Sequence, residues 1–335
     1  MVSSIYGVED QVQAIWVYLE HTDGSLENVS LEMLSEGRVL ADQMDWPLVA
    51  LLLGNSVEDL CQEAFIYGAD QVWLAEHKLL EHFTIEGYTS VIYQILLQSK
   101  PGVVFLGATH DGRDLAGRLA VRLRTGLNAD CTGLRINPAT GVLICEVSGF
   151  GGGVLALIEM RSHRPQMATV RPGVFSKRQT TSMPSETIIR PTFDIEPEHV
   201  YTKYIERVGG DYVDLTGSPV LVAGGRGVDG DFQMLDALAE LLNGETGATR
   251  PPVDDGYIER ERQIGQTGVV CSPKLAVCCG ISGAFHFVVG IEKAETVIAI
   301  NKDPKAPIFD HADYCIVGDV KQIIPKLIDT LNRKT

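Results

Sequence analysis

Short, continuous apolar runs alternate with amphipathic stretches in the first half of the chain, and this alternation constrains the fold more than any other feature. The runs occupy residues 14–20, 47–54, 71–75 and 102–108. Continuous apolar runs of this length are typical of strands that are buried on both faces. The stretches between them, such as residues 56–69 and 88–98, have helical spacing. This order predicts βαβ units, in which helices cover a parallel sheet.

A further helix is expected over residues 113–124, directly after the sequence GATHDG. Leu115, Leu119 and Leu123 recur every four residues and share one helical face, whereas the arginines of this stretch lie on another face. This segregation predicts a helix that packs on the sheet through its leucines.

The composition changes between Pro172 and His199, where prolines and polar residues repeat without a sustained period. Such a stretch is typical of a connection between domains. Beyond it the alternation resumes, and the Pro-rich residues 249–256 are expected to form a loop. The expected strands are residues 219–224, 275–280, 296–300 and 314–318, and the expected helices are Phe232 to Leu242, one after Ser282 and one from Val320.

These patterns predict an α/β protein with two doubly wound parallel-sheet domains. We place the N-terminal domain at residues 1–188, a linker at residues 189–210 and a smaller C-terminal domain at residues 211–335.

Composition and charge argue against a nucleic-acid-binding protein and indicate the compartment. The formal net charge is −16, with acidic residues spread along the chain, which argues against nucleic-acid binding because that binding depends on clustered Lys and Arg. The seven cysteines follow no regular framework and are interpreted as buried thiols of a reducing compartment. No apolar run reaches the roughly 18 residues of a membrane span, and the acidic start resembles neither a secretory signal nor a transit peptide. We therefore expect a soluble cytoplasmic protein.

Polar residues and glycines follow each expected strand of the C-terminal domain. GGRG (residues 224–227) follows the first strand, GISGA (residues 280–284) the second, and Asn301 and Asp319 the last two. Each feature alone has a structural explanation, since glycine favours turns and Asp caps helices. However, the carboxyl ends of parallel strands meet at one edge of a sheet, where ligands bind. The sequence therefore predicts a ligand site at this edge.

The type of ligand can be narrowed from the same residues. Glycines around Ser282 would let backbone amides approach a phosphate at the start of a helix, so a pyrophosphate fits. GRGVDG (residues 225–230) also matches the G-x-G-x-x-G pattern and suggests an alternative, an NAD-dependent dehydrogenase. Against this alternative, Asp229 and Asp231 would place carboxylates beside the pyrophosphate, and no convincing acid–base pair lies nearby. An adenine-nucleotide sensor built on the first domain is a second alternative.

The segments GGRG, GQTG, GISGA and INKDPKAPIFDHADYCIVGD, in this order, resemble the FAD-binding domain of the electron transfer flavoprotein alpha subunit. The segment GATHDGRDLAGRLAVRLRTGLNADCT is similar to the first domain of the same family. The resemblance covers nearly the entire chain.

The resemblance implies that FAD lies in the crevice of the C-terminal domain and that the chain has no substrate-converting site of its own, because the isoalloxazine ring carries the redox chemistry. The residues it assigns to the pyrophosphate and adenosine are Arg226, Ser282, Gly283, Ala284, Asn301, Asp319 and Val320. The residues it assigns to the flavin end are Thr249, Arg250, Ile264, Gly265, Gln266 and Thr267.

Two of these assignments carry a specific role. The charge of Arg250 is expected to stabilise reduced, anionic flavin, unless it is an ordinary surface arginine. The hydroxyl of Thr267 is expected to hydrogen-bond the flavin near N5, unless it only caps a turn.

The sequence departs from the family after the SGA turn. Many members have the pattern SGA-x-Gln-His, in which the imidazole approaches a flavin carbonyl. Here the stretch reads SGAFHF, so that Phe285 follows the turn, His286 is shifted by one position and Phe287 stands where the family has histidine. Either His286 contacts the flavin or it is a surface residue of the helix.

The segment HRPQMATVRPGVF (residues 163–175) resembles the electron-bifurcating branch of the family, although it could also be a strand and turn at a subunit interface. In that branch the beta subunit binds NADH and a second FAD. One electron goes to ferredoxin or flavodoxin, and the other passes through the FAD of the alpha subunit to an acyl-CoA dehydrogenase. The alternative within the family is a non-bifurcating housekeeping carrier.

Overall fold

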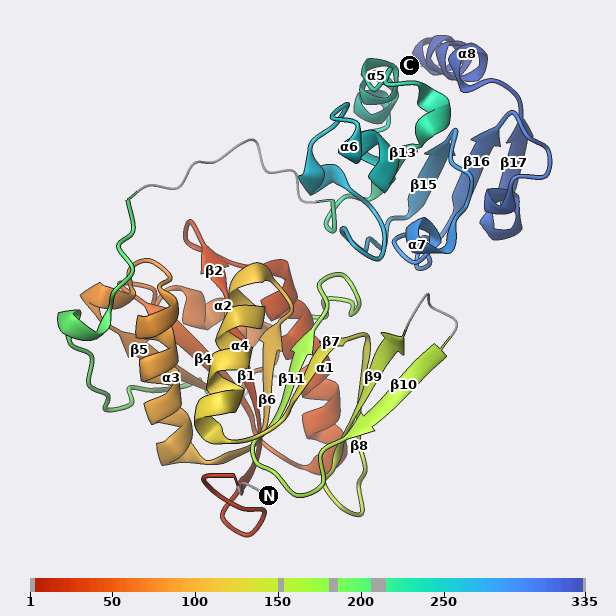
Figure 1. Cartoon of the computed structure of the whole chain (residues 1–335). Helices are drawn as coiled ribbons and strands as arrows, with labels where there is room; N and C mark the ends of the chain where they lie inside the picture. Colours follow the sequence, from red (N-terminus) through yellow and green to blue (C-terminus); the bar gives the residue numbers. More distant parts are fainter. Residues whose placement is uncertain (1–3, 150–153, 181–185, 206–214, 334–335) are drawn as a thin grey trace. The chain divides into compact units, whose positions relative to one another are not determined.

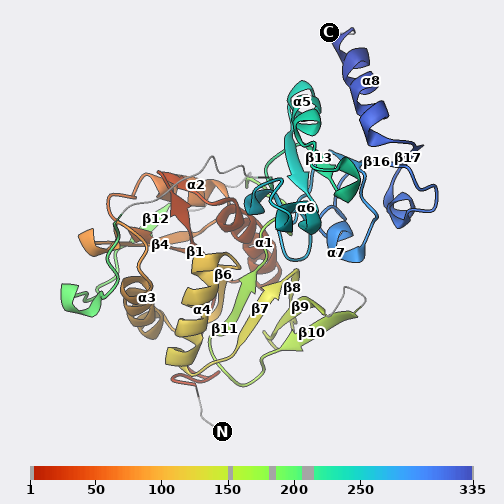
Figure 2. The same cartoon turned by 45° about the horizontal axis from the view of Figure 1, so that its top comes forward.

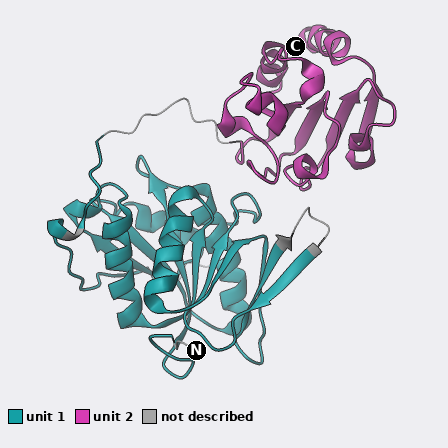
Figure 3. Cartoon of the chain, in the orientation of Figure 1, with its two compact units in different colours: residues 1–149, 153–207 teal, residues 150–152, 208–335 magenta. Residues whose placement is uncertain are grey.

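The computed structural model describes residues 4–149, 154–180, 186–205 and 215–333. The described residues fall into two compact units, one up to residue 205 and the other from residue 215 (Figure 3). Each unit has its own sheet and its own hydrophobic core.

The first unit is built on a parallel sheet of seven strands (Figure 1). Its four predicted strands are confirmed, and all residues of the second and fourth are buried, as expected from their apolar composition. The strands in spatial order are β12 (Thr187–Ile189), β5 (Gln71–Glu76), β4 (Leu48–Gly54), β1 (Val12–Leu19), β6 (Pro101–Gly107), β11 (Gln166–Val170) and β7 (Leu127–Cys131).

Helices cover both faces of this sheet, because alternate residues of each strand point to opposite sides. Helices α1 (Asn28–Met44) and α2 (Leu60–Ile66) cover one face, and α3 (Ile85–Ser99) and α4 (His110–Leu123) cover the other (Figure 2). Ile15 and Val17 of β1 join the core under α1 and α2, whereas Trp16 and Tyr18 join the core under α3 and α4. Leu115, Leu119 and Leu123 are fully buried in the latter core, which confirms the predicted leucine face.

Two small antiparallel sheets, which the sequence patterns did not predict, complete the first unit. They consist of β8 (Gly133–Ile136), β9 (Leu143–Gly149) and β10 (Val154–Glu159), and of β2 (His21–Thr22) and β3 (Ser25–Leu26).

Part of the expected linker belongs to the first unit. Phe193 and Ile195 pack against the core under α3. Gln94 of α3 donates to the carbonyl of Asp194 over 2.7 Å and accepts from the amide of Asp194 over 2.9 Å. These contacts attach a segment that the sequence alone places between the two domains.

The second unit has a five-stranded parallel sheet, also covered on both faces. The predicted strands and the helix after Phe232 are confirmed. The strands in spatial order are β14 (Glu245–Ala248), β13 (Val220–Gly224), β15 (Leu275–Cys279), β16 (Val297–Asn301) and β17 (Tyr314–Val317). The helices are α5 (Gln233–Leu241), α6 (Arg250–Asp254), α7 (Phe285–Val288) and α8 (Val320–Asn332).

The expectation of a loop at residues 249–256 is wrong, because α6 occupies most of it. Pro251 and Pro252 stand in the first turn of this helix, where a missing amide hydrogen costs nothing. Strand β14 was not predicted, since its sequence ETGA has little apolar content. The described residues also contain short 3-10 helices, namely η1 (Lys78–Leu80), η3 (Pro197–His199), η4 (Arg226–Val228), η5 (Arg260–Arg262) and η6 (Pro307–His311).

None of the seven cysteines forms a disulfide, and six of them are buried as predicted. Cys315 is the exception, because it lies exposed on the last strand of the second sheet. Burial raises the pKa of the Cys278 thiol to about 12, so this thiol stays protonated and unreactive at neutral pH. Within the described residues, the helices are too short or too polar to cross a membrane.

Candidate functional site

The order of strands in the second sheet creates a crevice between β13 and β15. The chain runs from β13 to β14 on one side and then returns to β15 on the other side of β13. The connections after these two strands therefore lead to helices on opposite faces of the sheet, α5 on one face and α7 on the other. Doubly wound sheets bind ligands at this topological switch point.

Glycines allow the loops after β13 and β15 to touch. The amide of Gly227 donates to the carbonyl of Gly280 over 3.0 Å, and the amide of Gly225 donates to the carbonyl of Cys279 over 2.9 Å. A Cβ atom at Gly225 would lie 2.5 Å from the oxygen of Gly280, which is too close for any side chain. Gly280 itself has φ +62°, a conformation that glycine adopts without strain. The floor of the crevice is therefore made of main chain.

The loop after β15 presents backbone donors that the protein does not use. Among the described residues, no acceptor receives a hydrogen bond from the four successive amides of residues 281–284. Gly283 has φ +90°, and the carbonyl of Ser282 accepts from the amide of Ile308 over 3.0 Å, which fixes the loop. Unused successive amides of this kind bind anions such as phosphate.

From the sequence, phosphate binding was attributed to the dipole of the helix that follows Ser282, which is α7. Helix α7 has only four residues, so its macrodipole is small. The open amides of the loop are the stronger reason to expect an anion here.

A pocket of about 160 Å³ lies at the same edge of the sheet. It receives residues from all four strand-end loops, which confirms the predicted convergence. Its lining residues are Gly227, Asp229, Gly280, Asn301, Lys302, Gly318, Asp319, Val320 and Lys321.

Hydrogen bonds hold the two polar residues of the later strands in place. The Nδ2 atom of Asn301 donates to the carbonyl of Ile281 over 2.7 Å and so ties the end of β16 to the loop after β15. The carboxylate of Asp319 accepts from the amide of Lys321 over 2.9 Å and caps α8. Asp319 therefore has the N-cap role that the sequence allowed, while it also lines the pocket.

Lys321 is a pocket residue that the sequence analysis missed. Its ammonium group lies 3.2 Å from the carboxylate of Asp229. The carboxylate of Asp229 alone would repel a pyrophosphate, but Lys321 compensates its charge. The only available signal was its place two residues after Asp319, in the first turn of a helix.

The predicted flavin-end residues lie around a second group of turns. The amide of Thr249 donates to the carbonyl of Gly224 over 2.9 Å, and that of Ile264 donates to Ala248 over 2.8 Å. Gly265, with φ +133°, begins a turn in which the amide of Gln266 donates to the carbonyl of His286 over 2.7 Å.

Side chains connect the same turns. The exposed hydroxyl of Thr267 accepts a hydrogen bond from the Nε2 atom of buried Gln263 over 2.9 Å. The Nδ1 atom of His286 lies 2.6 Å from the Oε1 atom of Gln266. Both Thr267 and Gln266 are therefore oriented by partners within the protein.

The remaining predicted site residues differ in exposure. Arg250 is exposed and pairs with Asp254 over 3.0 Å on its own helix. Five more predicted site residues are exposed, namely Arg226, Ser282, Ala284, Phe285 and His286. The side chains of a third set lie in the hydrophobic core, so only their backbone atoms can reach a ligand; they are Ile264, Phe287 and Val320.

Comparison with known proteins connects this geometry to a family. The electron transfer flavoprotein domain matches residues 15–195, and the electron transfer flavoprotein FAD-binding domain matches residues 214–292. The latter range contains the crevice loops and the open amides.

Full-length relatives agree with the domain matches. Protein FixB of Clostridium saccharobutylicum is 43% identical over 94% of this chain and 95% of its own length. The electron transfer flavoprotein subunit alpha of Thermoanaerobacterium thermosaccharolyticum is 42% identical over 95% and 98%. The acryloyl-CoA reductase electron transfer subunit beta of Anaerotignum propionicum is 38% identical over 95% of each chain.

The cofactor of the matched domain, FAD, fits the residues present, because its pyrophosphate needs the kind of unpaired amides that residues 281–284 offer. With a match over nearly its whole length, the chain belongs to the electron transfer flavoprotein alpha-subunit family.

Proposed function

We propose that the chain is the FAD-carrying subunit of a heterodimeric electron carrier that connects a beta subunit to an acyl-CoA dehydrogenase-type flavoenzyme. The open amides at the switch point of the FAD-binding domain are the observation that carries this proposal. The Anaerotignum relative, an electron transfer subunit of acryloyl-CoA reductase, supports an acyl-CoA-linked partner. Bound FAD supplies the redox chemistry, and the protein binds and tunes it.

The residues of the chain would divide this work between them. The amides of residues 281–284 bind the pyrophosphate, and Asn301 and Asp319 line the pocket for the adenosine. Thr267 already accepts from Gln263, so its hydroxyl hydrogen points to another acceptor, for which the flavin is suited. The exposed pair of Arg250 with Asp254 is weak, which leaves the guanidinium able to turn towards an anionic flavin.

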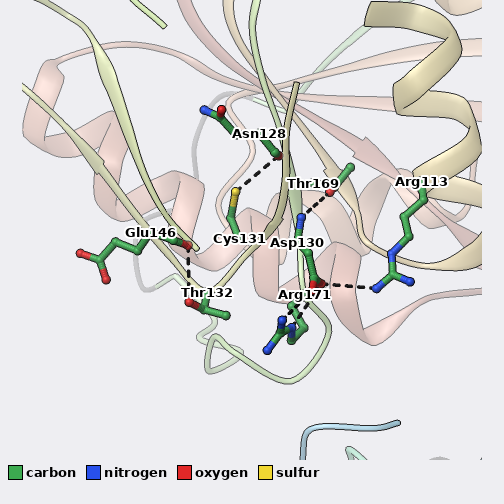
Figure 4. Close-up of polar contacts among 8 residues, drawn as sticks. All are labelled: Arg113, Asn128, Asp130, Cys131, Thr132, Glu146, Thr169 and Arg171. Carbon is green, nitrogen blue, oxygen red and sulfur yellow. Dashed lines mark hydrogen bonds and ion pairs between the residues drawn. The ribbon is translucent and has the colours of Figure 1, made fainter. Parts of the chain in front are cut away.

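We also propose that the carrier bifurcates electrons, on the basis of the segment at residues 163–175. Strand β11 leads directly to Arg171, whose guanidinium donates to both carboxylate oxygens of Asp130 over 3.2 and 2.5 Å (Figure 4). Arg113 of α4 reaches the same carboxylate over 3.3 Å. These arginines hold the pKa of Asp130 below its usual value despite its partial burial.

The cluster of Arg113, Arg171 and Asp130 contains two cations and one anion and therefore carries a net positive charge. Arg171 is only 9% exposed and is fixed by two hydrogen bonds, so its position is well defined. A fixed cation suits an anionic group of a partner, such as the second FAD of the beta subunit. In this proposal NADH reduces the beta subunit, and ferredoxin or flavodoxin accepts one of the electrons.

Spectra of the heterodimer test both proposals, that the chain carries FAD and that the carrier bifurcates electrons. Co-expression with the beta subunit should yield a yellow protein, whereas a colourless protein that refuses added FAD would refute FAD carriage. In stopped-flow experiments NADH should reduce two flavins. Arg171→Met should slow this reduction at least tenfold, while Arg135→Met, which removes an exposed arginine of the same unit, should not.

Reduction of a single flavin, or none, would favour the non-bifurcating carrier. The dehydrogenase alternative predicts a colourless protein with NAD affinity. It loses support because the matched domain binds FAD.

A further inference from the structure

The segment that leads from the first unit towards the second is anchored firmly at its beginning. Phe193 and Ile195 pack in the core under α3, and the side chains of Gln94 and Gln98 form hydrogen bonds with the main chain of this segment. An open groove of about 640 Å³ lies between η1 and residues 193–197, so these two parts are not tightly packed on each other. The anchor of the segment is therefore α3.

Two side-chain contacts hold the end of the segment, residues 200–205, to the first unit. The ring of Tyr204 stacks on the imidazole of His82, with 3.7 Å between the ring centroids and 16° between the ring planes. The hydroxyl of Thr202 donates to the carboxylate of Glu86 over 2.9 Å. Both contacts are exposed to solvent, where a ring stack or a hydrogen bond adds only modest stability.

Burial of apolar side chains contributes little to the docking of residues 200–205. Val200 reaches the first turn of α3, because its Cγ2 atom would lie 3.6 Å from a Cβ added at Gly87. In contrast, the large side chains of Tyr201 and Ile205 are 81% and 84% exposed, so the first unit leaves them uncovered. The ring of Tyr204 is therefore the principal contact at this end of the segment, and its loss would free the chain there.

We propose that residues 200–205 form a releasable strap, which the stack of Tyr204 on His82 closes against the first unit and whose release lengthens the connection to the second unit. The closed strap fixes the chain as far as Tyr204, whereas the open strap leaves it fixed only as far as Ile195 in the core. A longer free connection lets the second unit reach a larger volume. The strap needs no cofactor, so this inference goes beyond the proposed function and does not depend on it.

Limited trypsin digestion of the full-length chain, together with its beta subunit, measures the release, because Lys203 lies within the strap. The rate of cleavage after Lys203 follows the population of the open strap when opening and closing are fast. His82→Ala removes the stack without changing the residues around the cleavage site, and it should raise this rate about tenfold. His82→Phe keeps a ring that can stack and should be cleaved at the wild-type rate. Glu81→Ala, at an exposed neighbouring position, is the matched control and should also leave the rate unchanged.

Equal rates of cleavage after Lys203 in the wild type and in His82→Ala would overturn the inference. It would also be overturned if His82→Phe were cleaved as fast as His82→Ala, because the ring stack would then not be the contact that closes the strap. Mass spectrometry of the fragments gives a further check. If His82→Ala raised the cleavage rate equally at all trypsin sites, the first unit would be unfolding, and no separate strap would exist. A lack of bound FAD would refute the proposed function and leave the trypsin result standing, so the two failures are distinguishable.

Discussion

The two sheets of this chain have equivalent switch points, but only one of them is open to a ligand. In the first unit the chain runs from β1 through β4 to β5 and then returns to β6 on the other side of β1. The side chain of Glu20, directly after β1, lies against Gly107 and Gly112 at the start of α4. Thr109 donates to Glu20 over 2.7 Å and accepts from the amide of Gly112 over 2.9 Å.

In the second unit no side chain takes this place, and the amides of residues 281–284 have no acceptor among the described residues. At the same topological position, the first unit thus has a carboxylate of its own, and the second unit has four amides without an acceptor among the described residues. This difference argues against a nucleotide sensor on the first domain. It also shows that the site, and not the fold, decides the function.

The largest expected effect comes from closing the second crevice. In Gly283→Ala the added Cβ would overlap the backbone nitrogen of Ile308, and φ of +90° strains any other residue. We expect FAD affinity to fall about a thousandfold, or about 4 kcal/mol. Gly117→Ala is the control, because nothing lies within 4 Å of its Cβ. Fluorescence titration with FAD measures both, and equal affinities would contradict the proposed main-chain site.

The second effect concerns the carboxyl group that closes the first crevice. Burial raises the pKa of Glu20 from its usual 4.5 to about 7. Because the unfolded chain loses this proton first, the stability of the first unit falls as the pH rises from about 4.5 to about 7. Glu20→Gln removes this loss and should stabilise the first unit at pH 8 by up to about 3 kcal/mol.

Urea unfolding followed by tryptophan fluorescence suits this measurement, since Trp16, Trp46 and Trp73 all lie in the first unit. Glu9→Gln, at an exposed glutamate, serves as the control. If the free energy of unfolding of Glu20→Gln varies with pH as steeply as that of the wild type, a group other than Glu20 causes the pH dependence.

The variant Thr109→Val is expected to have a smaller effect on stability, and it tests whether the two switch points are independent of each other. The change removes the cap of α4 and the hydrogen bond to Glu20, so we expect the first unit to lose about 1.5 kcal/mol of stability. FAD affinity should stay the same, because the crevice of the second unit is built separately. A loss of FAD affinity in this variant, measured by titration, would mean that the two switch points are coupled.

The smallest effect is expected at the mouth of the pocket. Lys321 and Asp229 form an ion pair whose side chains are 47% and 77% exposed. A double-mutant cycle with Lys321→Met and Asp229→Asn should give a coupling energy below about 1 kcal/mol in FAD binding. A coupling above about 2 kcal/mol would indicate that bound FAD buries the pair.

The strands and the convergence of their loops were predictable because they depend on local patterns. Continuous apolar runs identified β1, β4, β5 and β6 of the first sheet and β13, β15, β16 and β17 of the second, but they missed the fully buried strand β11. The glycines after β13 and β15 marked the crevice. Parallel strands have their carboxyl ends at the same edge of a sheet, whatever the spatial order of the strands. The four polar loops that follow these strands were therefore expected at one edge.

Other features depend on contacts that no local pattern records. Strand β14 is held by pairing with β13, although its sequence is polar. Phe193 and Ile195 look like linker residues until the surface of α3 is known. Phe287 is buried and His286 is exposed because of the way α7 packs on the sheet, and a helix of four residues is too short to give a periodic sequence pattern.

The proposed use of main chain as the binding surface has a consequence for the tolerance of this loop to substitution. Replacing Ser282 by alanine removes a hydroxyl but leaves every amide of the loop in place, and Ala284 already lacks functional atoms. An alanine scan across this loop would therefore report tolerance at these positions, while the glycines beside them permit almost no change. In the proposed site, the shape of the turn would therefore be constrained, whereas its side chains could change without loss of cofactor binding.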